Sequence, residues 1–169
     1  LTVSVRRPRA GGRDRTIDAK GIALPAISRT VQTDALKYSH VSVEIDRARR
    51  AATFNIAAPE SKSPATLEAI LSAGALWWPL QMARELDDAI LNLRTNELEV
   101  GTWVLKTQGD AGQVIRMDEV LAKLKDHWLV KETTGALRRT PARIDVTSRS
   151  LIALVDAGSC FAGPFCGLA

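Results

Sequence analysis

The sequence lacks most of the features that mark secreted and membrane proteins. Its 169 residues include only two cysteines, Cys160 and Cys166, which are too few for a disulfide framework in a domain of this size. No apolar run approaches the roughly 20 residues that a membrane-spanning helix needs. No charged and apolar leader segment opens the sequence. We therefore expect a cytoplasmic protein without a membrane partner.

Histidine is equally scarce, which bears on metal binding. The two histidines, His40 and His127, lie far apart, and neither has a second ligand at the spacing of a metal site. Cys160 and Cys166 are six residues apart with no third ligand nearby. We expect no metal site.

Basic residues are concentrated at the beginning of the chain. Residues 1–37 hold eight Lys and Arg against three Asp, a balance of +5, whereas the other 132 residues balance at −1. A basic arm can bind nucleic acid through phosphates, but no aromatic side chain for base stacking lies between these arginines. Gly and Pro residues interrupt any regular element here. We expect residues 1–37 to be a basic linker or arm, and we expect no nucleic-acid partner.

Alternating residues predict the first two strands. Val41, Val43 and Ile45 alternate with polar side chains, which is typical of a strand with one buried face. Residues 53–56 predict a second strand, and the polar residues 47–50 between the two predict a turn. The pair should therefore form a β-hairpin.

A helix is predicted after the hairpin. Apolar residues recur every three or four positions from Trp77 to Leu93, the pattern of an amphipathic helix that packs on a sheet. Pro79 falls near the first turn of this helix, where its missing N–H costs little. A helical region already opens at residues 64–66.

The remaining pattern predicts strands that alternate with helices. Residues 102–105 and 151–155 are apolar runs typical of buried parallel strands. Between them, residues 118–132 and 134–148 predict two helices, of which Pro141 should kink or interrupt the second. Strand–helix–strand crossovers imply parallel pairing, so we predict an α/β fold with a β-hairpin followed by β-α-β units.

The segment 155–169 is the most informative part of the sequence. A predicted strand leads into a turn of small residues around Gly158, which we expect to open a helix. The first turn of a helix has unpaired N–H groups and a partial positive charge, and small residues let a ligand oxygen approach that backbone. Such a turn can hold a developing oxyanion. In the alternative interpretation, glycine stands at this turn for packing alone.

Other reactive side chains favour a structural interpretation. Ser159 and Cys160 lie before the expected helix, where a thiolate could be stabilised; their pattern differs from the Gly-x-Ser-x-Gly elbow of hydrolases. The pair Trp77–Trp78 could form a ligand platform, but packing in the core or under a lid is the simpler interpretation. Three carboxylates of the first long helix are expected on a solvated face: Glu85, Asp87 and Asp88.

Several stretches resemble one family. The run Gly158-Ser159-Cys160-Phe161-Ala162-Gly163, followed by Leu168-Ala169, resembles the strand-to-helix turn of the crotonase (enoyl-CoA hydratase) superfamily. About residues 38–169 resemble the second crotonase-like half of its ring-cleaving members. The further stretches that carry this resemblance are residues 77–80, 84–91, 93–99, 126–128 and 145–151.

The resemblance implies an incomplete crotonase-like domain over residues 38–169, cut short at its C-terminus. Its relatives open the oxygenated, dearomatised ring of benzoyl-CoA in aerobic benzoate degradation, as carbon–carbon lyases that release formate. The backbone N–H of Gly163, with Ala162 beside it, would hold the thioester oxyanion. The substrate would be an acyl-CoA whose CoA is no separate cofactor, and the full-length enzyme would be a homo-oligomer.

The sequence departs from the family pattern at two places. A second oxyanion donor is expected after the earlier parallel strand, where residues 108–112 lack the usual pattern. A glutamate is expected before Leu168, where Phe165-Cys166-Gly167 offers no acid. These departures favour an alternative in which the chain is a noncatalytic scaffolding or dimerising half-domain, inactive alone.

Overall fold

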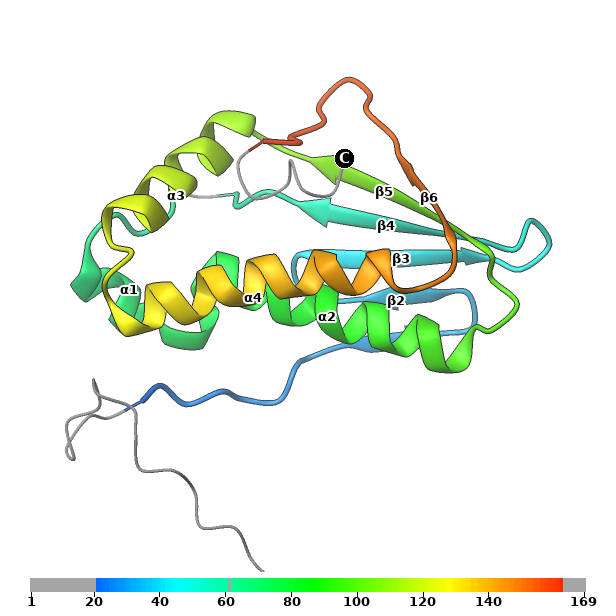
Figure 1. Ribbon diagram of the computed structural model, residues 1–169, viewed down its shortest axis with the longest axis horizontal. Helices are drawn as coiled ribbons and strands as arrows, with labels where there is room; N and C mark the ends of the chain where they lie inside the picture. Colours follow the sequence, from blue (N-terminus) through cyan, green and yellow to red (C-terminus); the bar gives the residue numbers. More distant parts are fainter. Residues whose placement is uncertain (1–20, 61, 163–169) are drawn as a thin grey trace, which may run out of the picture.

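The computed structural model describes residues 21–60 and 62–162. Within them, six strands form one mixed sheet in the order β1-β2-β3-β4-β5-β6 (Figure 1). The first four strands pair antiparallel, whereas β4–β5 and β5–β6 pair parallel. The predicted α/β class is confirmed. The strands are β1 Thr30–Gln32, β2 Ala35–Lys37, β3 Val41–Asp46, β4 Ala51–Ala57, β5 Thr102–Gln108 and β6 Ser150–Ala153.

The predicted hairpin is confirmed in β3 and β4. Val41, Val43 and Ile45 are buried on one face of β3, and their polar neighbours are exposed or half-exposed. The turn at residues 47–50 joins the two strands, and Val43 pairs with Phe54 across them. The period-two pattern therefore sets both the strand and the face that it buries.

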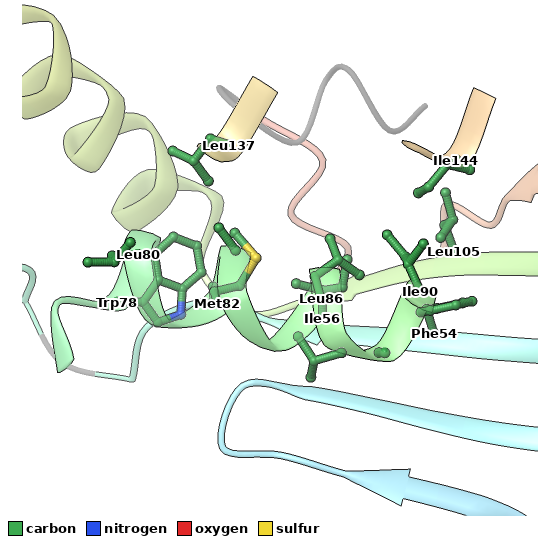
Figure 2. Close-up of a cluster of buried hydrophobic side chains, with 14 of the residues drawn as sticks. Phe54, Ile56, Trp78, Leu80, Met82, Leu86, Ile90, Leu105, Leu137 and Ile144 are labelled. Carbon is green, nitrogen blue, oxygen red and sulfur yellow. The ribbon is translucent and has the colours of Figure 1, made fainter. Parts of the chain in front are cut away.

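In the part of the chain that the structure describes, four α-helices and one short 3₁₀ helix lie between the strands. The amphipathic stripe predicted from Trp77 to Leu93 forms α2, with Pro79 in its first turn. α2 packs against β3, and α4 packs beside α2 (Figure 1). Figure 2 shows Leu137 and Ile144 of α4 next to the apolar side chains of α2. The helices are α1 Leu67–Ala73, η1 Gly74–Leu76, α2 Trp78–Asn96, α3 Ala111–Lys123 and α4 Trp128–Asp145.

The helices after β5 differ from the prediction in their bounds. α3 begins at Ala111 rather than near residue 118, because the carboxylate of Asp110 accepts the N–H of Gly112 and caps the helix. His127 caps α4 in the same way through its Nδ1, which accepts the N–H of Leu129 at 3.3 Å. Both helices therefore begin at a capping side chain that the apolar pattern alone does not reveal.

Pro141 does not interrupt its helix. α4 runs continuously from Trp128 to Asp145 with Pro141 inside it. A proline in a helix interior costs about 3 kcal/mol through its lost hydrogen bond and its ring. Leu137, Thr140 and Ile144 are buried on both sides of it, and their packing offsets that cost.

Two further corrections concern the ends of the sheet. Among the described residues, regular structure begins at Thr30, which corrects the expectation that Gly and Pro interrupt every regular element over residues 1–37: β2 pairs with β3, and its Leu36 is buried. The strand predicted over residues 151–155 is parallel, as expected, but it is not buried. Leu151 and Ile152 are 41% and 49% exposed, because β6 is the last strand of the sheet order.

Candidate active site at the carboxyl ends of the parallel strands

Three chain segments meet where the parallel strands end. β4, β5 and β6 point the same way, so the residues after each strand gather at one edge of the sheet (Figure 1). In open α/β sheets, ligands bind preferentially outside the carboxyl ends of the strands. This edge is therefore the expected place for a binding site.

Backbone hydrogen bonds hold the three segments together. The N–H of Ala58, after β4, donates to the carbonyl of Gln108 at 2.8 Å. The N–H of Gly109, after β5, donates to the carbonyl of Gly158 at 3.1 Å. The N–H of Cys160 donates to Oγ1 of Thr107 at 2.9 Å. Each turn is thus bonded to the next across the sheet.

Gly109 is required by this arrangement. Its φ is +132°, and a Cβ at this position would lie 2.6 Å from the Cβ of Ala58. Only glycine tolerates both the backbone conformation and the close approach. The sequence carried this signal as a glycine directly after an apolar strand.

The turn after β6 uses its own polar side chains. Oγ of Ser159 accepts the N–H of Asp156 at 2.9 Å and donates to the Asp156 carboxylate at 3.0 Å. Gly158 has a φ of +90°. The Ser159 hydroxyl is therefore committed to the turn, which supports the structural interpretation of this residue over a nucleophilic one.

Cys160 lies in the interior. Its side chain is fully buried, and burial raises the pKa of its thiol, although the Thr107 hydroxyl acts in the opposite direction. A protonated, inaccessible thiol is a poor nucleophile. The packing interpretation of Cys160 is favoured.

Of the two residues expected to hold the oxyanion, Ala162 is the last described residue and Gly163 is not described. Ala162 is half-buried and packs, with Phe161, against the core. Gly163, like Cys166, lies outside the described residues. Residues 159–162 are not helical, so the helix expected after Gly158 does not begin within them.

A depression of about 480 Å³ adjoins these turns. Its walls come from the segments after β4 and β5 and from the start of α3. Asp110 lines it, with its carboxylate bound to the N–H of Gly112 at 2.7 Å and to Arg116 at 3.4 Å. The lining residues are 57–60, 108–110 and Gln113. This is the region where the resemblance expects a second oxyanion donor.

The acidic residues of α2 are not all solvated, which corrects the prediction. Glu85 is only 2% exposed; its carboxylate accepts the N–H of His40 at 2.7 Å and Nε2 of Gln81 at 3.0 Å. Asp88 accepts the hydroxyl of Tyr38 at 2.8 Å. Both acids bind α2 to the segment around β2 and β3.

Asp87 binds α2 to α4 instead. Its Oδ1 lies 2.6 Å from Nε of Arg143 in α4. The three acids therefore hold α2 between two neighbours. Amphipathic periodicity alone gives no such signal, since it identifies the apolar stripe but not the partners of the polar face.

Two features are absent from the described residues. No helix in residues 21–60 or 62–162 is long and apolar enough to cross a bilayer. In the same part of the chain, no three His, Cys, Asp or Glu side chains are grouped so that they could hold a metal ion. The fold and the depression define an α/β protein with a candidate site at the carboxyl ends of its parallel strands.

Comparison with known proteins gives the relationship. No protein-family model matches the chain. The chain is 52% identical over 150 residues to the benzoyl-CoA-dihydrodiol lyase of Aromatoleum evansii. The match covers 89% of this chain and 27% of that enzyme. The resemblance is confirmed: the chain is related to benzoyl-CoA-dihydrodiol lyase and spans about a quarter of the length of that curated relative.

Proposed function

We propose that this chain is a segment of a benzoyl-CoA-dihydrodiol lyase and helps to hold the thioester of its substrate in aerobic benzoate degradation. The observation that carries the proposal is the identity of 52% over 89% of the chain. The geometry supports it, since the parallel strands β4 and β5 end beside one depression and Gly109 in its wall is hydrogen-bonded to the turn after β6. CoA would be part of the substrate, and the acting enzyme would be a homo-oligomer with a crotonase-like fold.

The chemistry follows from backbone donors at the strand ends. When a thioester carbonyl gains negative charge, preorganised N–H groups stabilise the oxyanion by several kcal/mol, about 3 for one donor. Gly163 and Ala162 would supply these donors after β6, as the resemblance implies. Ala162 stands two residues beyond Cys160, whose own N–H is already bound to Thr107.

A pair of variants at Gly163 tests the role of the donor. Gly163→Pro removes the N–H, whereas Gly163→Ala retains it and serves as the matched control. In an enzyme of the length of the curated relative, we expect Gly163→Pro to lower turnover of the dihydrodiol thioester by about 100-fold or more. Equal activity of the two variants would show that this amide takes no part in catalysis.

A noncatalytic scaffolding or dimerising half-domain is the second candidate. It is favoured by the absence of an acid in Phe165-Cys166-Gly167. Calorimetry with benzoyl-CoA separates the two candidates. Binding to the 169-residue chain, abolished by Gly163→Pro and kept by Gly163→Ala, supports a thioester site. A chain that dimerises but binds no thioester supports the scaffold.

A further inference from the structure

The chain leaves the sheet after β6 and enters the core again at Cys160. The N–H of Leu154 still donates to the carbonyl of Leu105 at 2.9 Å, which continues the pairing of β6 with β5. Residues 154–158 are exposed, Ser159 is half-buried and Cys160 is fully buried. The segment after β6 is therefore an exposed loop, and Cys160 is the residue at which this loop is anchored in the interior.

One buried side chain of β5 holds that anchor. The hydroxyl of Thr107 accepts the backbone N–H of Cys160 at 2.9 Å. Burial raises the pKa of the Cys160 thiol, and a hydrogen bond from the same hydroxyl to the thiol opposes that rise. Thr107 is only 2% exposed, and a hydrogen bond in the interior is stronger than one in water. Thr107 therefore holds both the backbone and the side chain of Cys160.

Packing alone does not require a hydroxyl at residue 107. Trp103 and Leu105 lie on the same buried face of β5 and are apolar. Valine has nearly the shape of threonine and is at least as suitable for a buried strand. A buried polar group is costly unless it is hydrogen-bonded, so the hydroxyl is explained by the bond that it makes to Cys160.

This bond joins the turn after β6 to the wall of the candidate site. Gln108 and Gly109 directly follow Thr107, and both line the depression of about 480 Å³. A second contact between the same two turns runs from the N–H of Gly109 to the carbonyl of Gly158 at 3.1 Å. That contact uses backbone atoms alone, whereas the contact of Thr107 depends on its side chain. The placement of the turn after β6 beside the depression therefore depends on the identity of residue 107.

We infer that Thr107 is a positioning residue of the proposed thioester site, an inference that rests on the proposed function. By holding Cys160, it fixes the place of Ala162, two residues further on, relative to the wall of the depression. An oxyanion donor must lie about 2.7–3.1 Å from the oxygen that gains the charge. A displacement of about 1 Å, even one caused far from the reacting atoms, can lower a rate by about 100-fold. Thr107 acts through the backbone rather than by contact with the substrate.

The test compares Thr107→Val with Thr107→Ser in an enzyme of the length of the curated relative. Valine keeps the shape of threonine but removes the acceptor, whereas serine keeps the acceptor. For turnover of the dihydrodiol thioester, Thr107→Val should lower kcat by about 10-fold to 100-fold and leave KM within about twofold of the wild type. Thr107→Ser should restore most of the lost kcat. A wild-type kcat in Thr107→Val would overturn the inference.

Hydrogen exchange of the Cys160 amide tests the physical step behind the loss of kcat. Because Thr107→Val leaves this buried N–H without its acceptor, its exchange should be at least about tenfold faster than in Thr107→Ser. Equal exchange in the two variants would mean that the hydroxyl does not anchor the turn, and the inference would be wrong.

Thr140→Val is the control for a general loss of stability. Thr140 is buried, and its hydroxyl donates to the carbonyl of Ala83 at 3.5 Å, between α4 and α2. This variant also removes a buried hydroxyl that joins two elements, but it should leave kcat and the exchange of the Cys160 amide unchanged. A loss of kcat equal to that of Thr107→Val would show that Thr107 contributes only stability.

Two further comparisons make every result decisive. If Thr107→Val does not fold, Thr107→Ala takes its place, because alanine and serine differ only in the hydroxyl. If Gly163→Pro loses activity while Thr107→Val keeps it, the thioester site is supported and the positioning role is wrong. If Gly163→Pro keeps full activity, the proposed function fails and this inference fails with it.

Discussion

Strands β5 and β6 run parallel and side by side, yet they differ in burial. On β5, Trp103, Leu105 and Thr107 are buried, and Trp103 packs on Phe54 of β4 with ring centroids 5.1 Å apart. On β6, Leu151, the partner of Trp103, and Ile152, the partner of Val104, are 41% and 49% exposed. The difference follows from position: β5 has strands on both sides, whereas β6 is paired to β5 alone among the described strands. Position in the sheet, rather than apolar content, decides how much a strand contributes to stability.

The largest effect is expected when one side chain is truncated in the centre of the sheet and one on the edge strand β6. Phe54→Ala empties part of the core, since Phe54 is fully buried, and should lower the free energy of unfolding by about 3–5 kcal/mol. Ile152→Ala should cost less than about 1 kcal/mol, because its side chain is already half in water. Urea unfolding of both variants measures the difference. Similar losses would mean that the centre and the edge are equally coupled to the core.

Gly109→Ala should have the next largest effect. The new Cβ would meet Ala58 at 2.6 Å, and the φ of +132° is unfavourable for alanine. A loss of about 1–3 kcal/mol is expected from strain of this kind. Gly101→Ala is the control, because a Cβ there meets nothing within 4 Å. If both variants unfold at the same urea concentration, the contact between the β4 and β5 turns is not tight.

Arg149 links the edge strand to the centre. Its guanidinium lies 5.1 Å from the ring centroid of Trp103, and its Nε donates to the carbonyl of Val100 at 2.9 Å. Arg149→Met keeps most of the apolar stem but removes the charge, and should cost about 1–2 kcal/mol. Arg49→Met is the control, since Arg49 is highly exposed. Stability equal to that of the control variant would show that Arg149 does not anchor β6.

The sequence predicted the parts of the fold that local periodicity controls. The hairpin of β3 and β4 and the apolar stripe of α2 appear where the pattern places them. Burial of residues 151–155 could not be predicted in this way, because an apolar run gives no information about which strand ends the sheet. β1 and β2 escaped prediction because each has only three residues, too few to show a period; β2 gains its pairing from β3, and β1 from β2.

The turns at the strand ends were predicted in their location but not in their contacts. Gly158 and the segment 108–110 both lie at the strand ends, as the turn pattern indicated. The hydrogen bond from Cys160 to Thr107 joins residues 53 positions apart, and no local pattern contains that information. The burial of Glu85 could not be predicted for the same reason. Its carboxylate accepts the backbone N–H of His40, which lies between β2 and β3, 45 residues earlier in the chain.

The smallest change in stability is expected at Cys160. This residue follows the exposed strand β6 and is itself fully buried in the core. Burial raises the pKa of its thiol above the ordinary value of 9.0. The folded chain therefore keeps this proton at a pH where the unfolded chain has lost it. The stabilisation is fully present below about pH 9 and is lost as the pH rises toward the folded pKa.

Urea unfolding at several pH values between about 8 and 11 measures the effect, because this range spans the ordinary pKa of a thiol. In a Cys166→Ser background, the free energy of unfolding should fall with pH more steeply than it does when Cys160→Ser is added. Tyr38, whose pKa is also raised by burial, is present in both proteins, so the difference isolates Cys160. A thiol reagent should modify Cys160 at least about tenfold more slowly before unfolding than after. Rapid modification of the folded chain, with parallel pH curves, would place Cys160 with the exposed edge rather than with the buried centre.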